Sequence, residues 1–86
     1  MFYVYVLQSA RLKKLYIGFT TDLRKRFNEH NRGKSVATKP YRPWTLIYYE
    51  ASLNEQDARR REAYLKTTQG YRLLQRRLKE YLYHQR

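Results

Sequence analysis

The chain has 86 residues and no cysteine, which bounds it to one small domain over residues 1–86 and excludes disulfides and cysteine zinc sites. No apolar run is long enough to span a membrane and no signal-peptide pattern opens the chain, so we expect a cytoplasmic protein. Nineteen Lys and Arg against seven Asp and Glu give a formal net charge of +12, which predicts a polyanionic partner, usually nucleic acid. A basic surface that only aids solubility is the alternative, and contact with an anionic membrane surface is a weaker one.

The first two predicted elements are strands. Residues 2–7 are β-branched and aromatic, and nearly all of them are apolar, which predicts a central strand that is buried on both faces. Residues 8–14 are polar and basic, as is typical of a hairpin connection. Residues 15–19 form the second predicted strand, which is antiparallel to the first because the connection is short.

A helix is predicted from Asp22 to about Asn31. Thr21 or Asp22 is its N-cap, because Thr and Asp oxygens accept the free amide protons at a helix start. Gly33 marks its end, since glycine accepts the left-handed conformation that follows many helices. Residues 34–43 then form a predicted loop with two prolines, several basic residues and few apolar anchors.

The second half of the chain predicts one strand and two helices: a strand over 44–51, a helix from Glu55 to about Thr67 capped by Asn54, and a helix over about 70–83 that follows a break at residues 68–70. The order β-β-α-β-α-α predicts an α+β fold in which a small three-stranded antiparallel sheet is flanked by helices. Residues 2–67 form its predicted core.

Five polar side chains stand out beside these elements: Tyr5, Tyr16, Arg26, His30 and Glu62. The tyrosines lie on adjacent strands and can project from one face, and Arg26 and His30 lie one helical turn apart. Each residue also has an ordinary explanation. The tyrosines can be core aromatics, His30 can be a charge that complements the helix C-terminus, and Glu62 can form a surface ion pair with Arg59 or Lys66.

Together these five residues supply what hydrolysis of a phosphodiester needs. A carboxylate can hold one Mg²⁺ or Mn²⁺ as a Lewis acid. An arginine can grip phosphate oxygens in two places, and a phenol or an imidazole can relay a proton from water. The basic loop 34–42 and the basic segment 72–86 can contact phosphates, and exposed tyrosines can stack on bases.

The ordered motifs resemble the GIY-YIG nuclease family, and more narrowly its small single-domain bacterial branch. Tyr3-Val4-Tyr5 stands at the position of the first motif, and Tyr16-Ile17-Gly18 matches the second. The spacing from Tyr16 to Arg26 and the helical segment Arg60-Arg61-Glu62-Ala63-Tyr64-Leu65 fit the family as well. The similarity covers residues 2–66.

The resemblance implies a phosphodiesterase that uses one divalent metal ion, Mg²⁺ or Mn²⁺, held by Glu62. Tyr16 would be the general base or would pass on the proton of the attacking water, and Tyr5 would support that water or the phosphate. Arg26 would stabilise the transition state, and His30 would aid proton transfer or grip phosphate. Nucleic-acid contacts are expected where the backbone can approach closely, at Gly18, and at four cations, Arg24, Lys34, Lys39 and Arg42.

The chain departs from the family pattern in three places. Tyr3 stands where the first motif has glycine, Phe19 stands where some relatives have lysine, and no residue over 69–77 matches a downstream asparagine. We therefore keep open a DNA endonuclease or structure-directed nuclease, a nucleic-acid-binding module with little or no catalysis, and a structural ribonucleoprotein component. We expect DNA rather than RNA as the partner, no membrane, and a monomer or weak homodimer.

Overall fold

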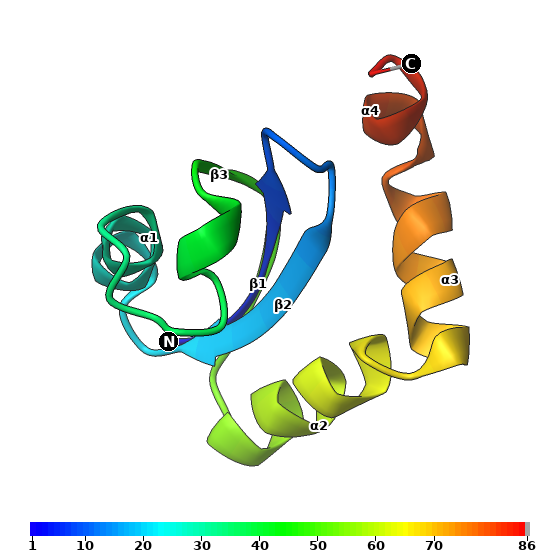
Figure 1. Ribbon diagram of the computed structural model, residues 1–86. Coiled ribbons are helices and arrows are strands. Elements are labelled where there is room, and N and C mark those ends of the chain that lie inside the picture. Colours follow the sequence, from blue (N-terminus) through cyan, green and yellow to red (C-terminus); the bar gives the residue numbers. More distant parts are fainter. Residues whose placement is uncertain (86) are drawn as a thin grey trace.

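The computed structural model describes residues 1–85. Within them the elements are, in chain order, β1 (Phe2–Ser9), β2 (Leu15–Thr20), α1 (Leu23–Asn31), the 3-10 helix η1 (Lys39–Tyr41), β3 (Trp44–Ser52), α2 (Glu55–Leu65), α3 (Thr68–Arg77) and α4 (Lys79–Tyr83). The strands form an antiparallel sheet in the order β2-β1-β3 (Figure 1). The α+β fold class is thus confirmed.

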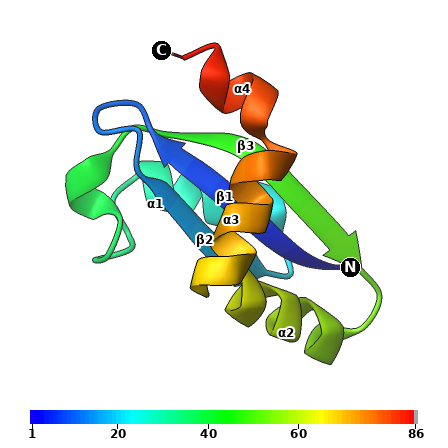
Figure 2. The ribbon, with the colours of Figure 1, turned by 90° about the vertical axis from the view of Figure 1, so that its right-hand side faces the viewer.

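The sheet carries helices on both faces because β1 buries side chains in both directions. Val4 and Val6 belong to an apolar cluster that includes residues of β2, α2 and α3. Tyr5 and Leu7 point the other way and pack with Trp44 and with apolar residues of α1. Figures 1 and 2 show α1 and η1 on one side of the sheet, and α2 and α3 on the other. The predicted central strand is confirmed.

Side-chain caps determine where α1 and α2 begin. Asp22 is the N-cap of α1, and its carboxylate accepts a hydrogen bond from the backbone N–H of Lys25 at 3.1 Å. Asn54 caps α2 in the same way, through the backbone N–H of Asp57. After α1, Gly33 has a φ of +77°, the left-handed conformation that its sequence position predicted. These caps set the phase of the two helices that carry the predicted arginine, histidine and glutamate.

The segment between α1 and β3 is more firmly held than its few apolar residues suggested. Thr38 is fully buried, just before η1. The indole Nε1 of Trp44 donates to the Thr38 carbonyl at 2.9 Å. The Asn31 side chain donates to the Trp44 carbonyl and accepts from the Trp44 backbone N–H. The loop is therefore tied both to the end of α1 and to the start of β3.

The prediction of one continuous helix over about 70–83 is wrong, because the structure has two helices there, α3 and α4. The Thr67 hydroxyl accepts from the backbone N–H of Gly70 at 3.1 Å, so α3 begins at Thr68, inside the predicted break. Leu78 then departs from helical geometry, with φ −105° and ψ 18°, and separates α3 from α4. The apolar residues keep helical spacing across Leu78, so the local pattern does not reveal the interruption.

The helices are short. The α2 helix has 11 residues, and no helix within residues 1–85 is long and apolar enough to cross a bilayer.

Candidate active site

Strand pairing brings the two motif tyrosines together on one face of the sheet. Tyr5 in β1 lies opposite Gly18 in β2, and Tyr16 lies opposite Leu7. The tyrosines are therefore diagonal neighbours, and their ring centroids are 6.4 Å apart. Tyr5 is buried, with 1% of its surface exposed, whereas Tyr16 is only partly buried. Tyr16 is thus the more accessible of the two phenols.

The missing side chain of Gly18 makes room for the Tyr5 phenol. A Cβ atom built at Gly18 would collide with the hydroxyl oxygen and the adjoining ring carbon of Tyr5. Substrate approach was the predicted reason for glycine at this position. In the structure, Tyr5 fills that space on this face of the sheet, so close packing within the protein accounts for the glycine.

Gly18→Ala is expected to lower the free energy of unfolding by about 1–3 kcal/mol, because the added methyl group overpacks a buried site. Urea unfolding followed by circular dichroism measures the change. The loss should be smaller in a Tyr5→Phe background, since the hydroxyl oxygen is the atom nearest to the new methyl group. An alanine variant as stable as the parent would contradict this packing.

Helix α1 places His30 against the Tyr5 phenol. The His30 Nε2 atom lies 2.8 Å from the Tyr5 hydroxyl, and Nδ1 lies 2.7 Å from the Thr38 hydroxyl. The Tyr16 ring stands edge-on to the imidazole, with 5.1 Å between centroids. His30 is fully buried, so the interpretation of this residue as a surface charge at the end of α1 is wrong. Instead, Tyr5, His30 and Thr38 form a buried chain of hydrogen bonds.

Burial controls the protonation of this chain. It raises the pKa of Tyr5 to about 12, although the Arg26 side chain beside the phenol lowers that pKa. Burial, and after it the positive charge of Arg26, lowers the pKa of His30 to about 4. At neutral pH the phenol is protonated and the imidazole is neutral. One imidazole nitrogen therefore donates a hydrogen bond and the other accepts one.

Thr38 is the member of this chain that the sequence did not predict. Its hydroxyl is hydrogen-bonded to His30 Nδ1, and its carbonyl accepts a hydrogen bond from the Trp44 indole N–H. A buried polar group needs a hydrogen-bonding partner, but no motif or spacing within residues 34–43 marks which residue turns inward. Only the path of the folded loop shows it.

Arg26 lies one turn before His30 and faces the same phenol. One of its Nη atoms is 3.2 Å from a carboxylate oxygen of Glu29, and 33% of the Arg26 side chain is exposed. Partial burial lowers the pKa of Arg26, but hydrogen bonding to Tyr5 and Glu29 outweighs this effect and raises the pKa. The guanidinium is therefore charged, held in place and still accessible to a phosphate.

Helix α2 brings Glu62 within electrostatic reach of the cluster. Burial is the main cause of the raised pKa of Tyr5, and the negative charge of Glu62 adds to it. The Glu62 carboxylate also pairs with the Lys66 ammonium at 2.9 Å. Of the two partners that the ordinary interpretation offered, Lys66 forms the pair, whereas Arg59 pairs with Glu55. Glu62 thus combines a surface ion pair with a charge that acts on the Tyr5 phenol.

A metal site here would depend on one protein carboxylate. Within residues 1–85, no group of three or more His, Cys, Asp or Glu side chains is placed to hold a metal ion. Mg²⁺ is commonly bound through one or two carboxylates together with water and substrate phosphates, and Mn²⁺ accepts the same oxygen ligands. A single carboxylate such as that of Glu62, completed by water and substrate phosphate, would therefore suit one ion of this kind.

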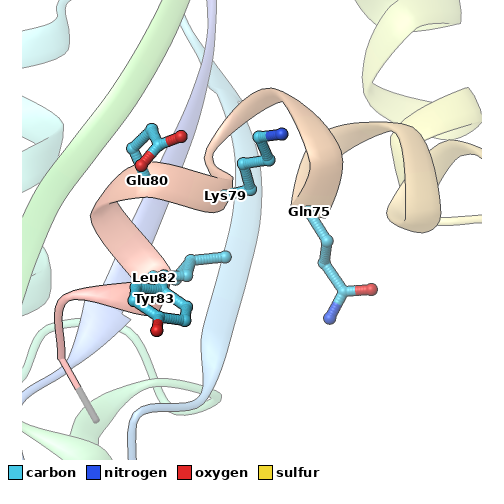
Figure 3. A pocket seen from close by; sticks show the side chains of 5 residues that line it. All are labelled: Gln75, Lys79, Glu80, Leu82 and Tyr83. Atoms are coloured by element: carbon cyan, nitrogen blue, oxygen red, sulfur yellow. The ribbon is translucent and has the colours of Figure 1, made fainter.

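The four cations that were predicted to contact nucleic acid line two surface hollows. Arg24 and Lys34 line a hollow of about 330 Å³ along α1. Lys39 and Arg42 line another, of about 730 Å³, next to η1. A third hollow, of about 540 Å³, lies at α3 and α4 (Figure 3) and is lined by Gln75, Lys79, Glu80, Leu82 and Tyr83. It contains none of the predicted site residues.

A known protein family matches most of the chain. The GIY-YIG catalytic domain matches residues 1–74. The chain therefore belongs to the GIY-YIG family, whose catalytic domain is of the nuclease type.

The chain is also similar to small bacterial proteins. It is 46% identical over 65 residues to a UPF0213 protein of Streptococcus pyogenes serotype M5 (strain Manfredo), a match that covers 74% of this chain and 70% of the relative. It is 45% identical over 65 residues, with the same coverage, to a UPF0213 protein of Streptococcus pyogenes serotype M3 (strain SSI-1). No solved structure matches the chain significantly.

Proposed function

We propose that this protein is a metal-dependent endonuclease or structure-directed nuclease that hydrolyses phosphodiester bonds in DNA. One observation carries the proposal: the Tyr16 ring, the His30 imidazole and the Arg26 side chain all lie next to the buried Tyr5 phenol. The nuclease-type family supports the reaction, and the net charge of +12 supports a nucleic-acid substrate.

Tyr16 is the proposed general base, or the group that passes on the proton of the attacking water. It is the partly exposed phenol of the pair. Its ring contacts Tyr5, His30 and Trp44, with centroid distances of 6.4, 5.1 and 6.2 Å, which hold the ring in one orientation. A group that moves a proton must be held within hydrogen-bond reach of it. The aromatic cluster gives Tyr16 that fixed position.

Tyr5 and His30 have narrower proposed roles than the family resemblance implied. Both are enclosed, with at most 1% of their surface exposed. We assign them to positioning: His30 holds the Tyr5 hydroxyl, and Tyr5 in turn packs against Tyr16 and borders Arg26. Their substitution would then affect the geometry of the two accessible groups.

Arg26 is the proposed stabiliser of transition-state charge. A planar guanidinium can donate two parallel hydrogen bonds to phosphate oxygens, which an ammonium group cannot do. Arg26 is held by Glu29 and Tyr5 and remains a third exposed. It can therefore contact a phosphate with little rearrangement.

Arg26→Lys is expected to lower the rate of DNA cleavage by about 10²-fold, because the charge remains but the two-point grip is lost. Single-turnover cleavage with enzyme in excess measures the chemical step. Lys25→Arg is the matched control, since it also exchanges one cation for another and Lys25 lies on the exposed side of the same helix. Equal rates for the Arg26 variant and the control would contradict the assigned role.

Glu62 is the proposed protein ligand of the metal ion. A bound Mg²⁺ or Mn²⁺ would supply Lewis acidity that favours attack on the phosphate. Glu62 would have to exchange its ion pair with Lys66 for this ligand. The Lys66 side chain is 50% exposed, and exposed pairs of this kind contribute only about 0–1 kcal/mol, so the exchange costs little.

A cleavage panel tests the proposed activity. Branched, nicked, single-stranded and duplex DNA, with the same strands as RNA, would be incubated with Mg²⁺ or Mn²⁺ and separately with EDTA. The proposal expects metal-dependent cleavage of at least one DNA substrate and none in EDTA. Cleavage that persists in EDTA contradicts the metal requirement, and cleavage of RNA alone contradicts the choice of DNA.

A nucleic-acid-binding module without catalysis is the second candidate. The Glu62–Lys66 ion pair favours it, because the carboxylate already has a partner within the protein. Under this alternative, DNA binds with equal affinity in EDTA and in Mg²⁺, and no substrate of the panel is cut. The same panel therefore separates the two functions.

A further inference from the structure

Two basic segments that are distant in sequence meet at one end of the sheet. The turn between β1 and β2 carries Arg11, Lys13 and Lys14, and the loop before β3 carries Lys39 and Arg42. We call these five cations the turn–loop surface. Residues 1–21 and 30–49 contain no acidic residue. Within residues 1–85, the ion pairs involve other cations, which lie in α1, in or directly after α2, and near the C-terminal end. The positive charge of this surface is therefore not neutralised by the protein.

Hydrogen bonds dock the turn firmly onto the loop. Ser9, which is fully buried, donates from its hydroxyl to the Tyr41 carbonyl at 2.7 Å and accepts from the Leu12 backbone N–H. The backbone N–H of Ala10 donates to the Pro43 carbonyl at 2.9 Å. The Arg11 guanidinium also donates to a loop carbonyl, that of Pro40, at 3.2 Å. The two segments thus present their cations as one preorganised unit.

Cations of the turn–loop surface line a hollow whose walls are partly apolar. This hollow of about 730 Å³ is lined by Arg11, Asn31, Val36, Lys39, Pro40, Arg42 and Pro43. The apolar side chain of Val36 is 90% exposed in this otherwise polar loop and is therefore available to a ligand. Cations around apolar side chains match the chemistry of an unpaired nucleotide, which has a charged phosphate and apolar sugar and base faces. A duplex would present mainly its phosphates, because its bases are stacked inside.

This surface leads directly to the proposed catalytic cluster. Lys14 lies directly before the start of β2 and two residues before Tyr16 in the sequence. The Lys14 ammonium lies 4.4 Å from the ring centroid of Tyr41, which packs in the same apolar cluster as Tyr16. Thr38, from the same loop, is hydrogen-bonded to His30. A strand that lies on the cations would therefore pass next to the accessible phenol.

We propose that the turn–loop surface binds an unpaired DNA strand that flanks the phosphodiester bond to be cut. The placement of this strand next to a cleavage point rests on the proposed nuclease function. The binding itself needs neither metal nor catalysis. It assigns a function to the β1–β2 turn, and it specifies a substrate with a single-stranded region beside the cleavage point.

The test measures binding in EDTA, where cleavage is not expected. The full chain carrying Arg11→Gln/Lys14→Gln is compared with the parent by fluorescence anisotropy of a labelled single strand and of a blunt duplex. For the single strand, the dissociation constant should rise about tenfold near 0.1 M salt. The magnitude of the slope of log affinity against log salt should fall by about 1.4, because two phosphate contacts are lost and each contributes about 0.7. The effect on the duplex should be smaller.

Two further variants make the result specific. Arg59→Gln/Arg60→Gln removes the same charge from exposed positions of α2, which lies at the opposite end of the sheet from the β1–β2 turn (Figure 1), and should leave single-strand affinity within about twofold of the parent. Arg11→Lys/Lys14→Arg keeps the charge and should restore binding. The proposal is overturned if the α2 variant weakens binding as much, if the charge-preserving variant fails to restore it, or if only duplex binding suffers.

The outcome is separable from the proposed function. If no DNA is cut but the Arg11→Gln/Lys14→Gln variant loses single-strand affinity, the nuclease proposal fails and the surface stands. If DNA is cut but this variant binds single strands as the parent does, the surface is overturned and the nuclease proposal stands.

Discussion

Replacing Glu62 by glutamine is expected to lower the rate of metal-dependent DNA cleavage on the order of 10³-fold while the protein stays folded. Glutamine keeps the shape of the side chain but removes the negative charge that a hard divalent cation needs. The loss of the ion pair with Lys66, 2.9 Å long at the surface, should change stability by less than about 1 kcal/mol. Single-turnover cleavage and urea unfolding measure the two quantities separately.

Glu55→Gln is the matched control for this experiment. Glu55 lies in the same helix and also pairs with a cation four residues on, since its carboxylate is 2.9 Å from Arg59. This variant should cleave at the parental rate. Lys66→Gln should also retain cleavage, because it removes the ion pair and leaves the carboxylate. If Lys66→Gln is as inactive as Glu62→Gln, the ion pair matters rather than a metal, and the assignment of Glu62 as ligand fails.

Acidification is expected to destabilise the fold through His30. Burial lowers the pKa of His30 from its ordinary value of 6.5 to about 4. Between these values the unfolded chain binds a proton that the folded chain does not, so the free energy of unfolding falls as the pH drops from 6.5 to 4. The contribution is on the order of 3 kcal/mol over that window. Urea unfolding at several pH values measures it.

Histidine variants isolate this effect from the titration of carboxylates. His30→Gln should be less stable than the parent at pH 7, because its buried hydrogen bonds are disturbed, but the difference should shrink towards pH 4. His84→Gln, which changes a side chain that is 74% exposed, should follow the parental pH profile. If His30→Gln does not fold, the protonation of His30 can still be followed by NMR of the parent protein. His30 ring resonances that titrate between pH 7 and 5.5 would contradict a neutral, buried imidazole.

Local sequence signals predicted most of the framework. The apolar run of β1 identified the central strand, because a strand buried on both faces needs apolar residues at nearly every position. Asp22 and Asn54 marked the starts of α1 and α2, since capping depends on residues only three positions apart. The division between α3 and α4 was missed, because the spacing of leucines stays helical through Leu78.

The candidate site shows where local signals stop. Sequence order and spacing predicted Tyr5, Tyr16, Arg26, His30 and Glu62 as the candidate site, because motif residues keep their separations along the chain. Which of these groups solvent can reach was not predictable, since burial depends on segments far apart in sequence. Thr38 encloses His30, and Tyr5 fills the space above Gly18.

The sequence by itself therefore determined most of the elements, their order and the candidate residues of the site, because periodicity, capping and charge are properties of neighbouring residues. Only the tertiary structure decided which of these side chains are buried and which remain accessible to solvent. It enclosed Tyr5 and His30, left Tyr16 and Arg26 accessible, and docked the β1–β2 turn onto the loop before β3. The physical reason is that long-range packing and hydrogen bonding determine which polar groups lose contact with water.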